Sequence, residues 1–409
     1  MSERTSYGKA VLVVCDGLGD RPTVEGRTPL QAADTPNLDA ISEAGINGLV
    51  TIIAPGIVPG SDTAHLALFG YDPYEFYPGR GVFEVLGADM PLNKGDVAFR
   101  ANFATVDDDL RVIDRRAGRK GSKGMAKLLN GLEIDDVQIY LENTTEHRGA
   151  LVMTGSNLSR DVSNVDSHVA GSIVAECKPL KDTDAAKKTA NVVNEFVRKS
   201  YELLNHHPEN DDRRRNGELP ANIILLRGAG SYRQVPPMSE RQGFRTACVT
   251  GASLYKGVAK YVGMDVIPVE GATGKSDTNL KNKAEATLHA LEHYDFVFAH
   301  IKATDSFGHD GDFEGKREMI SRIDSEFMSR LKETDAYIVV TADHSTPVSL
   351  KRHSSDPTPI VMNGAGVRSD KVDVYDEIAV ASGGLGRIRG LDLVPILSDF
   401  MGYYKMYGT

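Results

Sequence analysis

Three short apolar runs of this sequence each lead to an aspartate. The runs span residues 11–14, 296–301 and 337–340, and the aspartates are Asp16, Asp305 and Asp343. Apolar runs without polar alternation are typical of strands that are buried on both faces of a parallel sheet. Ligands bind to such sheets in the crevice beyond the carboxyl ends of the strands. The pattern therefore predicts an α/β fold in which acidic side chains meet at one edge of a parallel sheet.

Length and charge narrow the class of protein. The chain has 409 residues, of which 41% are hydrophobic and 25% charged, so we expect a globular protein of about two domains. Its formal net charge of −10 argues against a general nucleic-acid-binding surface. Cys15, Cys177 and Cys248 are widely spaced, which disfavours a disulfide framework or a thiolate zinc site and favours a reducing compartment.

The sequence offers no targeting or membrane signal. Residues 1–9 contain no apolar targeting core, and no apolar run approaches the roughly 20 residues that a membrane-spanning helix needs. We therefore expect a cytoplasmic protein with neither a membrane nor a nucleic acid as its partner.

The middle of the chain differs in character from its two ends. Strand and helix predictions alternate at both ends, and a strand at 223–226 belongs to the later series. We therefore predict a doubly wound, mostly parallel sheet built from residues 1–94 and 181–409. Residues 95–180 carry strand-like runs between charged turns, which predicts an inserted α+β domain. The charged segment 206–218 is predicted to be a solvated loop.

Histidines accompany two of the three aspartates and favour a metal site. Asp305 and His309 are four residues apart, so on a helix or a tight turn they share one face. His344 directly follows Asp343 at a predicted strand end, and His353 follows in a polar loop. Alone, each of these residues is more often a turn cap or a surface group. Together, carboxylates and imidazoles without a thiolate suit Mn²⁺, Zn²⁺ or Co²⁺, and two ions about 3.5–4 Å apart stabilise phosphoryl transfer.

A hydroxyl group stands at the start of another predicted helix. Residues 60–65 read Gly-Ser-Asp-Thr-Ala-His and lie between a Gly/Pro loop and an apolar run. Free backbone N–H groups at a helix N-terminus favour a bound phosphate, and a metal ion activates a coordinated hydroxyl. We therefore predict that Ser61 is a nucleophile, with Thr63 as the second choice. The alternative is that Ser61 only caps the helix.

Seven segments of the chain match a known family. They are 13–22, 28–39, 59–65, 79–81, 271–274, 302–311 and 341–347. These segments resemble the cofactor-independent phosphoglycerate mutases, in particular the archaeal-type branch within the alkaline phosphatase superfamily. The resemblance covers almost the whole chain and is weakest in residues 95–180. The bacterial-type enzymes have Asn-Ser-Glu around the serine, whereas this chain has Gly60-Ser61-Asp62.

The resemblance implies an isomerase with an alkaline phosphatase-like fold and two divalent ions. One ion would be held by Asp305, His309 and His353, and the other by Asp16, Ser61, Asp343 and His344. Ser61 would be transiently phosphorylated while 2-phosphoglycerate and 3-phosphoglycerate interconvert, a step of glycolysis and gluconeogenesis, without a bisphosphoglycerate cofactor. Mn²⁺ is the expected metal, with Mg²⁺, Co²⁺ and Zn²⁺ as alternatives.

The same mechanism gives the inserted domain a role. Water would hydrolyse a phosphoserine, so the domain is predicted to act as a lid that clamps the substrate and excludes water. The candidate contacts are His147, Arg148, Asp166, His168 and Arg227, with Asp166 taking up or delivering the glycerate proton. The expected partner is a small phosphoglycerate molecule, and assembly into a homo-oligomer stays open.

Two other functions fit parts of the pattern. A metal-dependent phosphomonoesterase, or a mutase of another phosphorylated metabolite, would keep the metal site and differ in the lid contacts. A non-catalytic metal- or phosphate-binding module would not need Ser61 beside the ligands. Interconversion of phosphoglycerates, measured against release of free phosphate, tests the first alternative, and a Ser61 variant tests the second.

Overall fold

The chain divides into two compact units. The computed structural model describes residues 8–167, 169–403, 406 and 408. Unit 1 comprises Met1–Tyr77 and Val235–Thr409, and unit 2 comprises Pro78–Gln234. An inserted domain is therefore present, but it extends beyond the predicted residues 95–180 at both ends. His168, one of the predicted lid contacts, lies outside the described residues.

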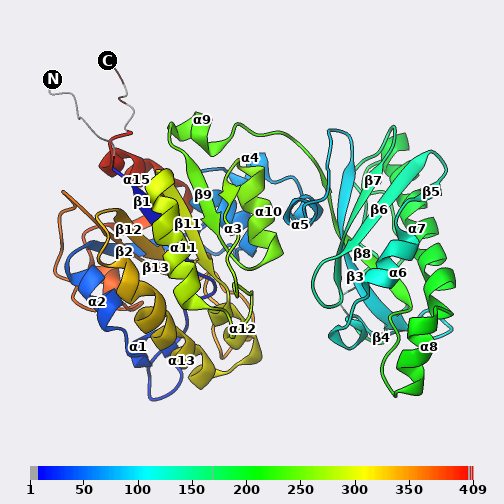
Figure 1. Cartoon of the computed structure of the whole chain (residues 1–409), viewed down its shortest axis with the longest axis horizontal. Helices are drawn as coiled ribbons and strands as arrows, with labels where there is room; N and C mark the ends of the chain where they lie inside the picture. The colour runs from blue at the N-terminus through cyan, green and yellow to red at the C-terminus, as the bar shows by residue number, and fades with distance from the viewer. Residues whose placement is uncertain (1–7, 168, 404–405, 407, 409) are drawn as a thin grey trace. The chain divides into compact units, whose positions relative to one another are not determined.

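Unit 1 is built on a mostly parallel sheet, as predicted. Within the described residues the sheet has eight strands in the order β10-β9-β11-β1-β12-β13-β2-β14 (Figure 1). All neighbours are parallel except β13, which is antiparallel to both β12 and β2. The strands are β1 (Ala10–Cys15), β2 (Ile46–Thr51), β9 (Thr246–Val249), β10 (Asp265–Val266), β11 (Phe296–Ile301), β12 (Tyr337–Thr341), β13 (Thr358–Asn363) and β14 (Gly386–Arg389).

The three central strands end together. Every residue of β1, β11 and β12 is buried, which explains why their sequences are apolar throughout. Cys15 of β1 pairs with Ile301 of β11, and Val14 pairs with Thr341 of β12. Because the strands are parallel and in this register, the segments that follow them emerge at one edge of the sheet.

Helices pack on both faces of this sheet. On one face, Val11 and Val13 of β1 share a core with Leu280 of α11 and Ile320 of α13. On the other face, the His65 ring of α3 packs edge-on against Phe298, with ring centroids 5.3 Å apart. The helices are α1 (Pro29–Ala32), α2 (Pro36–Glu43), α3 (Ser61–Leu68), α4 (Pro73–Phe76), α9 (Met238–Gln242), α10 (Ser253–Tyr261), α11 (Leu280–His293), α12 (Ala303–Asp310), α13 (Phe313–Ile323), α14 (Ser329–Leu331) and α15 (Leu393–Met401).

Short helical turns complete unit 1. A π-helical turn at Asp324–Met328 joins α13 to α14, and 3₁₀ turns lie at Val380–Ser382 and Gly390–Asp392. Nowhere in the described part of the chain is there a helix that is both long and apolar enough to cross a membrane.

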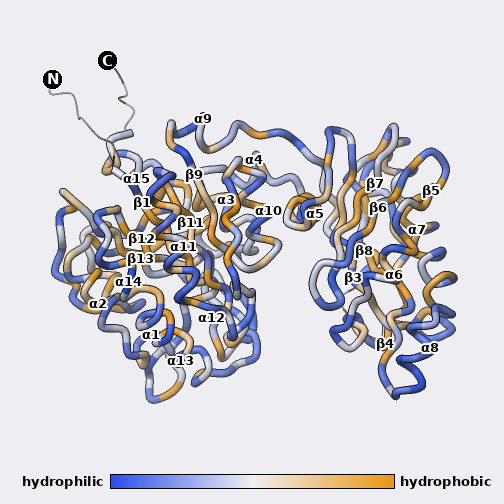
Figure 2. Tube along the Cα trace, viewed as in Figure 1, coloured by the Kyte–Doolittle hydropathy of each residue, from blue (hydrophilic) through white to orange (hydrophobic). Residues whose placement is uncertain are grey.

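Unit 2 is an antiparallel sheet with helices, as the α+β prediction requires. Its described strands run β4-β3-β7-β6-β5, and β8 pairs with β3. Figure 2 shows apolar stretches along these strands. The elements are β3 (Val97–Val106), β4 (Val112–Asp114), β5 (Leu132–Ile134), β6 (Val137–Asn143), β7 (Arg148–Thr154), β8 (Ile223–Ser231), α5 (Arg80–Gly87), α6 (Lys123–Leu129), α7 (Asp184–Asn205), α8 (Pro208–Arg215) and a 3₁₀ turn at Ala117–Arg119.

Strand β8 explains why the predicted boundaries are too narrow. The run at 223–226 was expected in the large sheet, but β8 pairs antiparallel with β3 from Ile223 to Ser231. Helix α7 packs its Val193 and Phe196 into the same core as Ile224. Segments on both sides of residues 95–180 thus fold with them. The segment 206–218, predicted as a loop, contains α8.

Candidate active site

The predicted metal-binding residues gather at the carboxyl edge of the large sheet. Asp16 follows β1, Asp343 and His344 follow β12, and α12 begins two residues after the end of β11. Two groups have ligand atoms that all lie within 4.8 Å of one another. The first is Asp305, His309 and His353, and the second is Asp16, Asp305 and His344. Asp305 therefore belongs to both groups.

The first group is preorganised to bind a cation. The Nε2 atoms of His309 and His353 lie 3.4 Å and 3.6 Å from Oδ1 of Asp305. The Nδ1 atom of His309 bonds to the carbonyl of Lys351 at 3.0 Å, and that of His353 bonds to the carbonyl of Pro59 at 2.9 Å. A carbonyl only accepts, so each Nδ1 carries the proton and each Nε2 presents a lone pair.

The second group centres on Nε2 of His344. This atom lies 3.2 Å from Oδ2 of Asp343 and 3.5 Å from Oδ1 of Asp16. Thr346 Oγ1 donates to Asp305 at 2.9 Å, so it accepts from Nδ1 of His344 at 3.0 Å. Burial lowers the pKa of His344, but Asp343, Asp16 and Asp305 outweigh burial and raise it to about 9. The carboxylates thus favour positive charge at this position.

Two buried carboxylate oxygens test whether a metal fits this group. Oδ1 of Asp16 and Oδ2 of Asp343 have no hydrogen-bond partner among the described residues, and both side chains are fully buried. Buried polar atoms are almost always paired, and an unpaired one is destabilising. A divalent cation would satisfy both oxygens, and a set of carboxylates and imidazoles suits such an ion. The residues present therefore fit a metal.

Ser61 brings a hydroxyl group to the second group of ligands. Its Oγ lies 3.2 Å from Nε2 of His344. Ser61 is the first residue of α3 and Gly60 is its N-cap, so Ser61 does not cap this helix. The second-choice residue, Thr63, donates its hydroxyl to the carbonyl of Gly60 at 3.0 Å. Of these two hydroxyl groups, it is therefore that of Ser61 that lies beside a candidate ligand.

Besides Thr346, three further residues at this site were not predicted from the sequence. Lys302 Nζ donates to Asp305 Oδ2 at 2.8 Å and to Asp16 Oδ2 at 3.4 Å. The hydroxyl of Tyr255 also donates to Asp16 Oδ2, which lies 3.1 Å from His300 Nε2. Burial raises the pKa of Asp16, but Lys302, His300 and His344 outweigh burial and hold the pKa well below its usual range.

The positions of these residues explain why they were missed. His300 lies near the end of β11 and Lys302 directly follows that strand. Their closeness in sequence to Asp305 could have indicated that they belong to the same site. Tyr255 comes from α10, which carries no motif that connects it with Asp16. Burial lowers the pKa of His300 to about 4 despite its bond to Asp16, so this imidazole is a neutral donor at pH 7.

Unit 2 places most of the predicted lid contacts in one basic region. Arg100 of β3 pairs in register with Arg227 of β8. Arg148 is the first residue of β7, which also pairs with β3 and places Arg148 opposite Asn102. Arg80 and Arg100 both bond to the buried carboxylate of Glu84. We call Arg80, Arg100, Arg148 and Arg227 the arginine cluster. Glu84 lies close to Arg80 and Arg100, and the carboxylate of Asp166 acts on Arg227.

The pKa values of Arg100, a member of the cluster, and of His147, which lies beside it, show the effect of this positive charge. Burial lowers the pKa of Arg100 to about 9 against the effect of Glu84, and Arg227 and the other arginines add to the decrease. Nε of Arg100 has no hydrogen-bond partner among the described residues. Burial, Arg148 and Arg100 lower the pKa of His147 to about 4. A bound anion would relieve the repulsion between these arginines.

Asp166 is engaged in an ion pair. Arg115 donates to both of its carboxylate oxygens at 2.7 Å, and Asn102 Nδ2 donates at 3.2 Å. A bidentate pair of this kind fixes both partners. The side chain of Arg115 is therefore held by a buried carboxylate.

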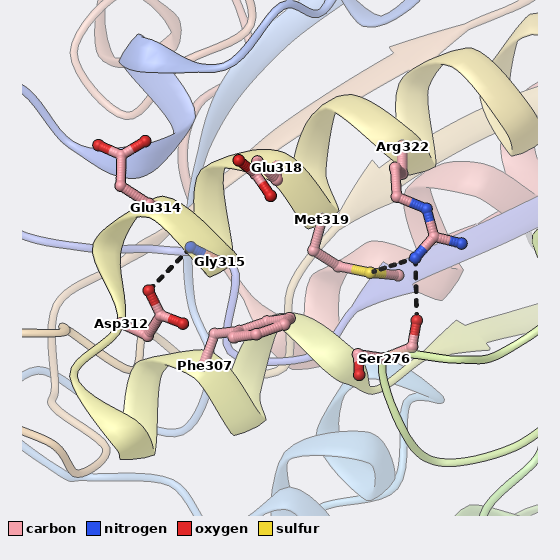
Figure 3. Close-up of a pocket in the computed structure, with 8 residues that line it drawn as sticks. All are labelled: Ser276, Phe307, Asp312, Glu314, Gly315, Glu318, Met319 and Arg322. Atoms are coloured by element: carbon pink, nitrogen blue, oxygen red, sulfur yellow. Dashed lines mark hydrogen bonds between the residues drawn. The ribbon is translucent and has the colours of Figure 1, made fainter.

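A surface hollow of about 390 Å³ lies along α12 and α13. None of the seven predicted metal-site residues lines it. Figure 3 shows Phe307 and Met319 beside the carboxylates of Asp312 and Glu318. Arg322 of this hollow already donates to the carbonyl of Ser276 at 2.9 Å. An acidic lining disfavours a phosphate, so this hollow is not the candidate active site.

Comparisons with known proteins identify the family of this chain. Residues 8–399 match the family model described as the metalloenzyme superfamily. The 2,3-bisphosphoglycerate-independent phosphoglycerate mutase of Methanococcus aeolicus is 46% identical over 405 residues, which cover 98% of this chain and 100% of that protein. A protein of that name from Archaeoglobus fulgidus is 48% identical over 407 residues, covering 98% of this chain and 99% of its own length.

Two solved structures share the fold over nearly the whole chain. The cofactor-independent phosphoglycerate mutase of Thermoplasma acidophilum has a TM-score of 0.71 and 37% identity, covering 97% of this chain and 100% of that one. A protein of Pyrococcus horikoshii has a TM-score of 0.86 and 38% identity, covering 99% and 100%. The chain therefore belongs to the 2,3-bisphosphoglycerate-independent phosphoglycerate mutases, within the metalloenzyme superfamily.

Proposed function

We propose that this chain is an isomerase that interconverts 2-phosphoglycerate and 3-phosphoglycerate, a step of glycolysis and gluconeogenesis, through a phosphoserine on Ser61. The observation that carries the proposal is the position of Ser61 Oγ, 3.2 Å from His344 Nε2 within a group of metal-ligand candidates. The substrate is suggested by the names of the relatives, which are close to this chain over its full length. A binding module would have no need of a hydroxyl group at this place.

Two sets of residues would hold divalent ions, with Mn²⁺ as the proposed metal. Asp305, His309 and His353 form one set, and Asp16, Ser61, Asp343 and His344 form the other. Such ions, when bound, favour the ionised serine hydroxyl and offset charge on the phosphoryl oxygens. Oxygen-rich ligation with some imidazole suits Mn²⁺.

The reaction proceeds as two displacements at phosphorus. Ser61 Oγ attacks the substrate phosphorus, its bond to phosphorus forms, and the bond from phosphorus to the glycerate oxygen breaks. The proton that Ser61 loses balances the one that the departing glycerate oxygen takes up. The other hydroxyl of the retained glycerate then attacks the phosphoserine and regenerates Ser61. The phosphoryl group returns to the same glycerate, so no bisphosphoglycerate or nucleotide is needed as a phosphoryl donor, and no net water is consumed.

Unit 2 is proposed to hold the anionic substrate and keep water from the phosphoserine. The arginine cluster offers planar guanidinium groups, which bind carboxylate and phosphate in a bidentate manner. The Nε atom of Arg100, which has no hydrogen-bond partner among the described residues, supports this role. Asp166 is better suited to positioning Arg115 than to carrying the glycerate proton, because Arg115 already occupies both of its oxygens.

The proposed compartment is the cytoplasm. Cys15, Cys177 and Cys248 are free and buried. Burial raises the pKa of Cys15 and Cys248 to about 12 and that of Cys177 to about 11, so none is a reactive thiolate at pH 7. Unpaired cysteines of this kind are compatible with a reducing environment.

A serine-to-alanine variant tests the proposal. Ser61→Ala should reduce interconversion of the phosphoglycerates by about 10³-fold or more, because it removes the group that accepts the phosphoryl. It should also abolish the 80-dalton phosphoryl adduct that mass spectrometry of the quenched wild-type enzyme would show, roughly the mass of PO₃H. Thr63→Ala, which deletes the neighbouring hydroxyl of the same helix, should retain activity and the adduct.

The same assays separate this function from its rivals. Wild-type turnover by Ser61→Ala would remove Ser61 from its role and return the site to simple metal binding. Release of free phosphate faster than interconversion would identify a phosphomonoesterase instead.

A further inference from the structure

The C-terminal end of α11 carries three potential metal ligands outside the candidate active site. His289, Glu292 and His293 offer one ligand atom each, and these atoms all lie within 4.8 Å of one another. Nδ1 of His289 lies 3.3 Å from Oε2 of Glu292, and Nε2 of His293 lies 4.0 Å from the same oxygen. The two imidazole rings have centroids 5.4 Å apart.

Helix geometry explains this convergence. Residues three and four apart share one face of a helix, so His289 points to the same side as Glu292 and His293. The end of the helix is well fixed, because Tyr294 N donates to the carbonyl of Ala290 at 2.9 Å and Lys9 Nζ donates to that of Glu292 at 3.1 Å. The backbone therefore holds the spacing while the side chains extend outward.

We propose that His289, Glu292 and His293 form a peripheral site for a transition-metal ion of the Zn²⁺ class. Two imidazoles and a carboxylate are a common protein ligand set for Zn²⁺, and water would complete the coordination. The side chains of the three residues are 70%, 64% and 66% exposed, so an ion can reach them without opening the fold. A cation is also favoured at the C-terminal end of a helix.

This site is separate from the candidate active site. His293 lies shortly before β11 begins at Phe296, whereas Asp305 follows the end of that strand. A six-residue strand spans about 20 Å. The proposed site therefore lies near the amino edge of the sheet, and the candidate active site lies at the carboxyl edge. None of its residues takes part in the proposed phosphoryl transfer, so the inference does not depend on that function.

The chemistry of the two sites also differs. The candidate active site combines buried carboxylates with histidines and a serine, whereas the peripheral site has two imidazoles to one carboxylate. Imidazole ligands favour Zn²⁺, Cu²⁺ and Ni²⁺ over Mn²⁺. The peripheral site should therefore stay empty in Mn²⁺ and fill in Zn²⁺.

Calorimetric titration of the full-length, metal-stripped protein with Zn²⁺ tests the proposal. The variant His289→Ala/His293→Ala should bind one Zn²⁺ per chain fewer than the wild type. His293→Ala alone should weaken that one ion by more than tenfold, since loss of even an outer-shell partner costs roughly 10–100-fold. His206→Ala removes another exposed histidine and should leave the stoichiometry unchanged.

Two readouts keep the test decisive. Activity in Mn²⁺ and the midpoint of thermal unfolding should match the wild type in the double variant, which shows that the fold and the active site are intact. Equal Zn²⁺ stoichiometry and affinity in the wild type and the double variant would overturn the proposal. So would an equal loss in His206→Ala, because binding would then be a general property of exposed histidines.

Discussion

Thr346 links the two groups of candidate ligands through one hydroxyl. It donates to Asp305 and accepts from Nδ1 of His344, which fixes the tautomer that leaves Nε2 of His344 free for a metal. Thr346→Val keeps the shape and removes both bonds. We expect it to reduce metal affinity and activity by roughly 10–100-fold, whereas Thr346→Ser keeps both properties. Titration with Mn²⁺ and the mutase assay measure the effect, and equal behaviour of the two variants would show that the hydroxyl is unimportant.

For single residues, a position just after a buried strand was the strongest predictor of a place in the candidate active site. Asp16, Asp305 and Asp343 could be identified because each follows a buried strand, and the register of β1 with β11 and β12 brings the strand ends together. Tyr255 and Thr346 could not be predicted as partners, because a hydrogen bond between distant segments leaves no spacing in the sequence. Asp166 was found, but its ion pair with Arg115 was not.

Among the elements, α12 shows how a glycine allows close packing beside the ligands. Glycine disfavours a helix, which made the segment 305–309 ambiguous from sequence. The structure supplies the reason for Gly308: a Cβ there would lie 2.4 Å from the carbonyl oxygen of Thr346. The helix can therefore approach the segment after β12 only without a side chain at this position.

Gly308→Ala should consequently push α12 away from Thr346 and displace Asp305 and His309. We expect a loss of about 1–3 kcal/mol in the free energy of unfolding, together with weaker metal binding. Denaturant unfolding and Mn²⁺ titration measure these changes. Gly124→Ala is the matched control, because a Cβ at that helical position meets nothing closer than 3.5 Å. Equal effects of the two substitutions would show that helix propensity, and not close approach, explains Gly308.

Helix α8 marks a limit of hydrophobic periodicity as a predictor. Its sequence, Pro-Glu-Asn-Asp-Asp-Arg-Arg-Arg, has almost no apolar face and therefore reads as a loop. Its charges nevertheless suit a helix, since acids occupy the first turn and arginines the last. Arg213 and Asn210 anchor it through bonds to Gly121 and Ala221. The sequence shows the charge pattern of the two helix ends. It does not show the anchoring contacts, because these join residues that are far apart in the chain.

For the whole molecule, the division into two units was predictable but its boundaries were not. The change in composition near residue 95 indicated an insertion. Strand β8, more than a hundred residues after the start of β3, pairs with it, and apolar periodicity cannot tell which sheet a strand joins. Each unit has its own apolar core, and every predicted metal ligand belongs to unit 1.

Metal removal should therefore act on one unit. Without a cation, Oδ1 of Asp16 and Oδ2 of Asp343 stay buried without a hydrogen bond from the described residues. A metal ion that binds them only in the folded state should therefore stabilise unit 1. At 100 times its Kd, Mn²⁺ should add about 2.7 kcal/mol, which slows amide exchange about 100-fold in β1, β11 and β12. Chelation should reverse this protection and leave exchange in β3 and β7 unchanged.

Hydrogen exchange read by mass spectrometry distinguishes the two sheets within one sample. Equal protection of both sheets by Mn²⁺ would mean that the units unfold as one, and no protection in β1 would contradict the metal site itself.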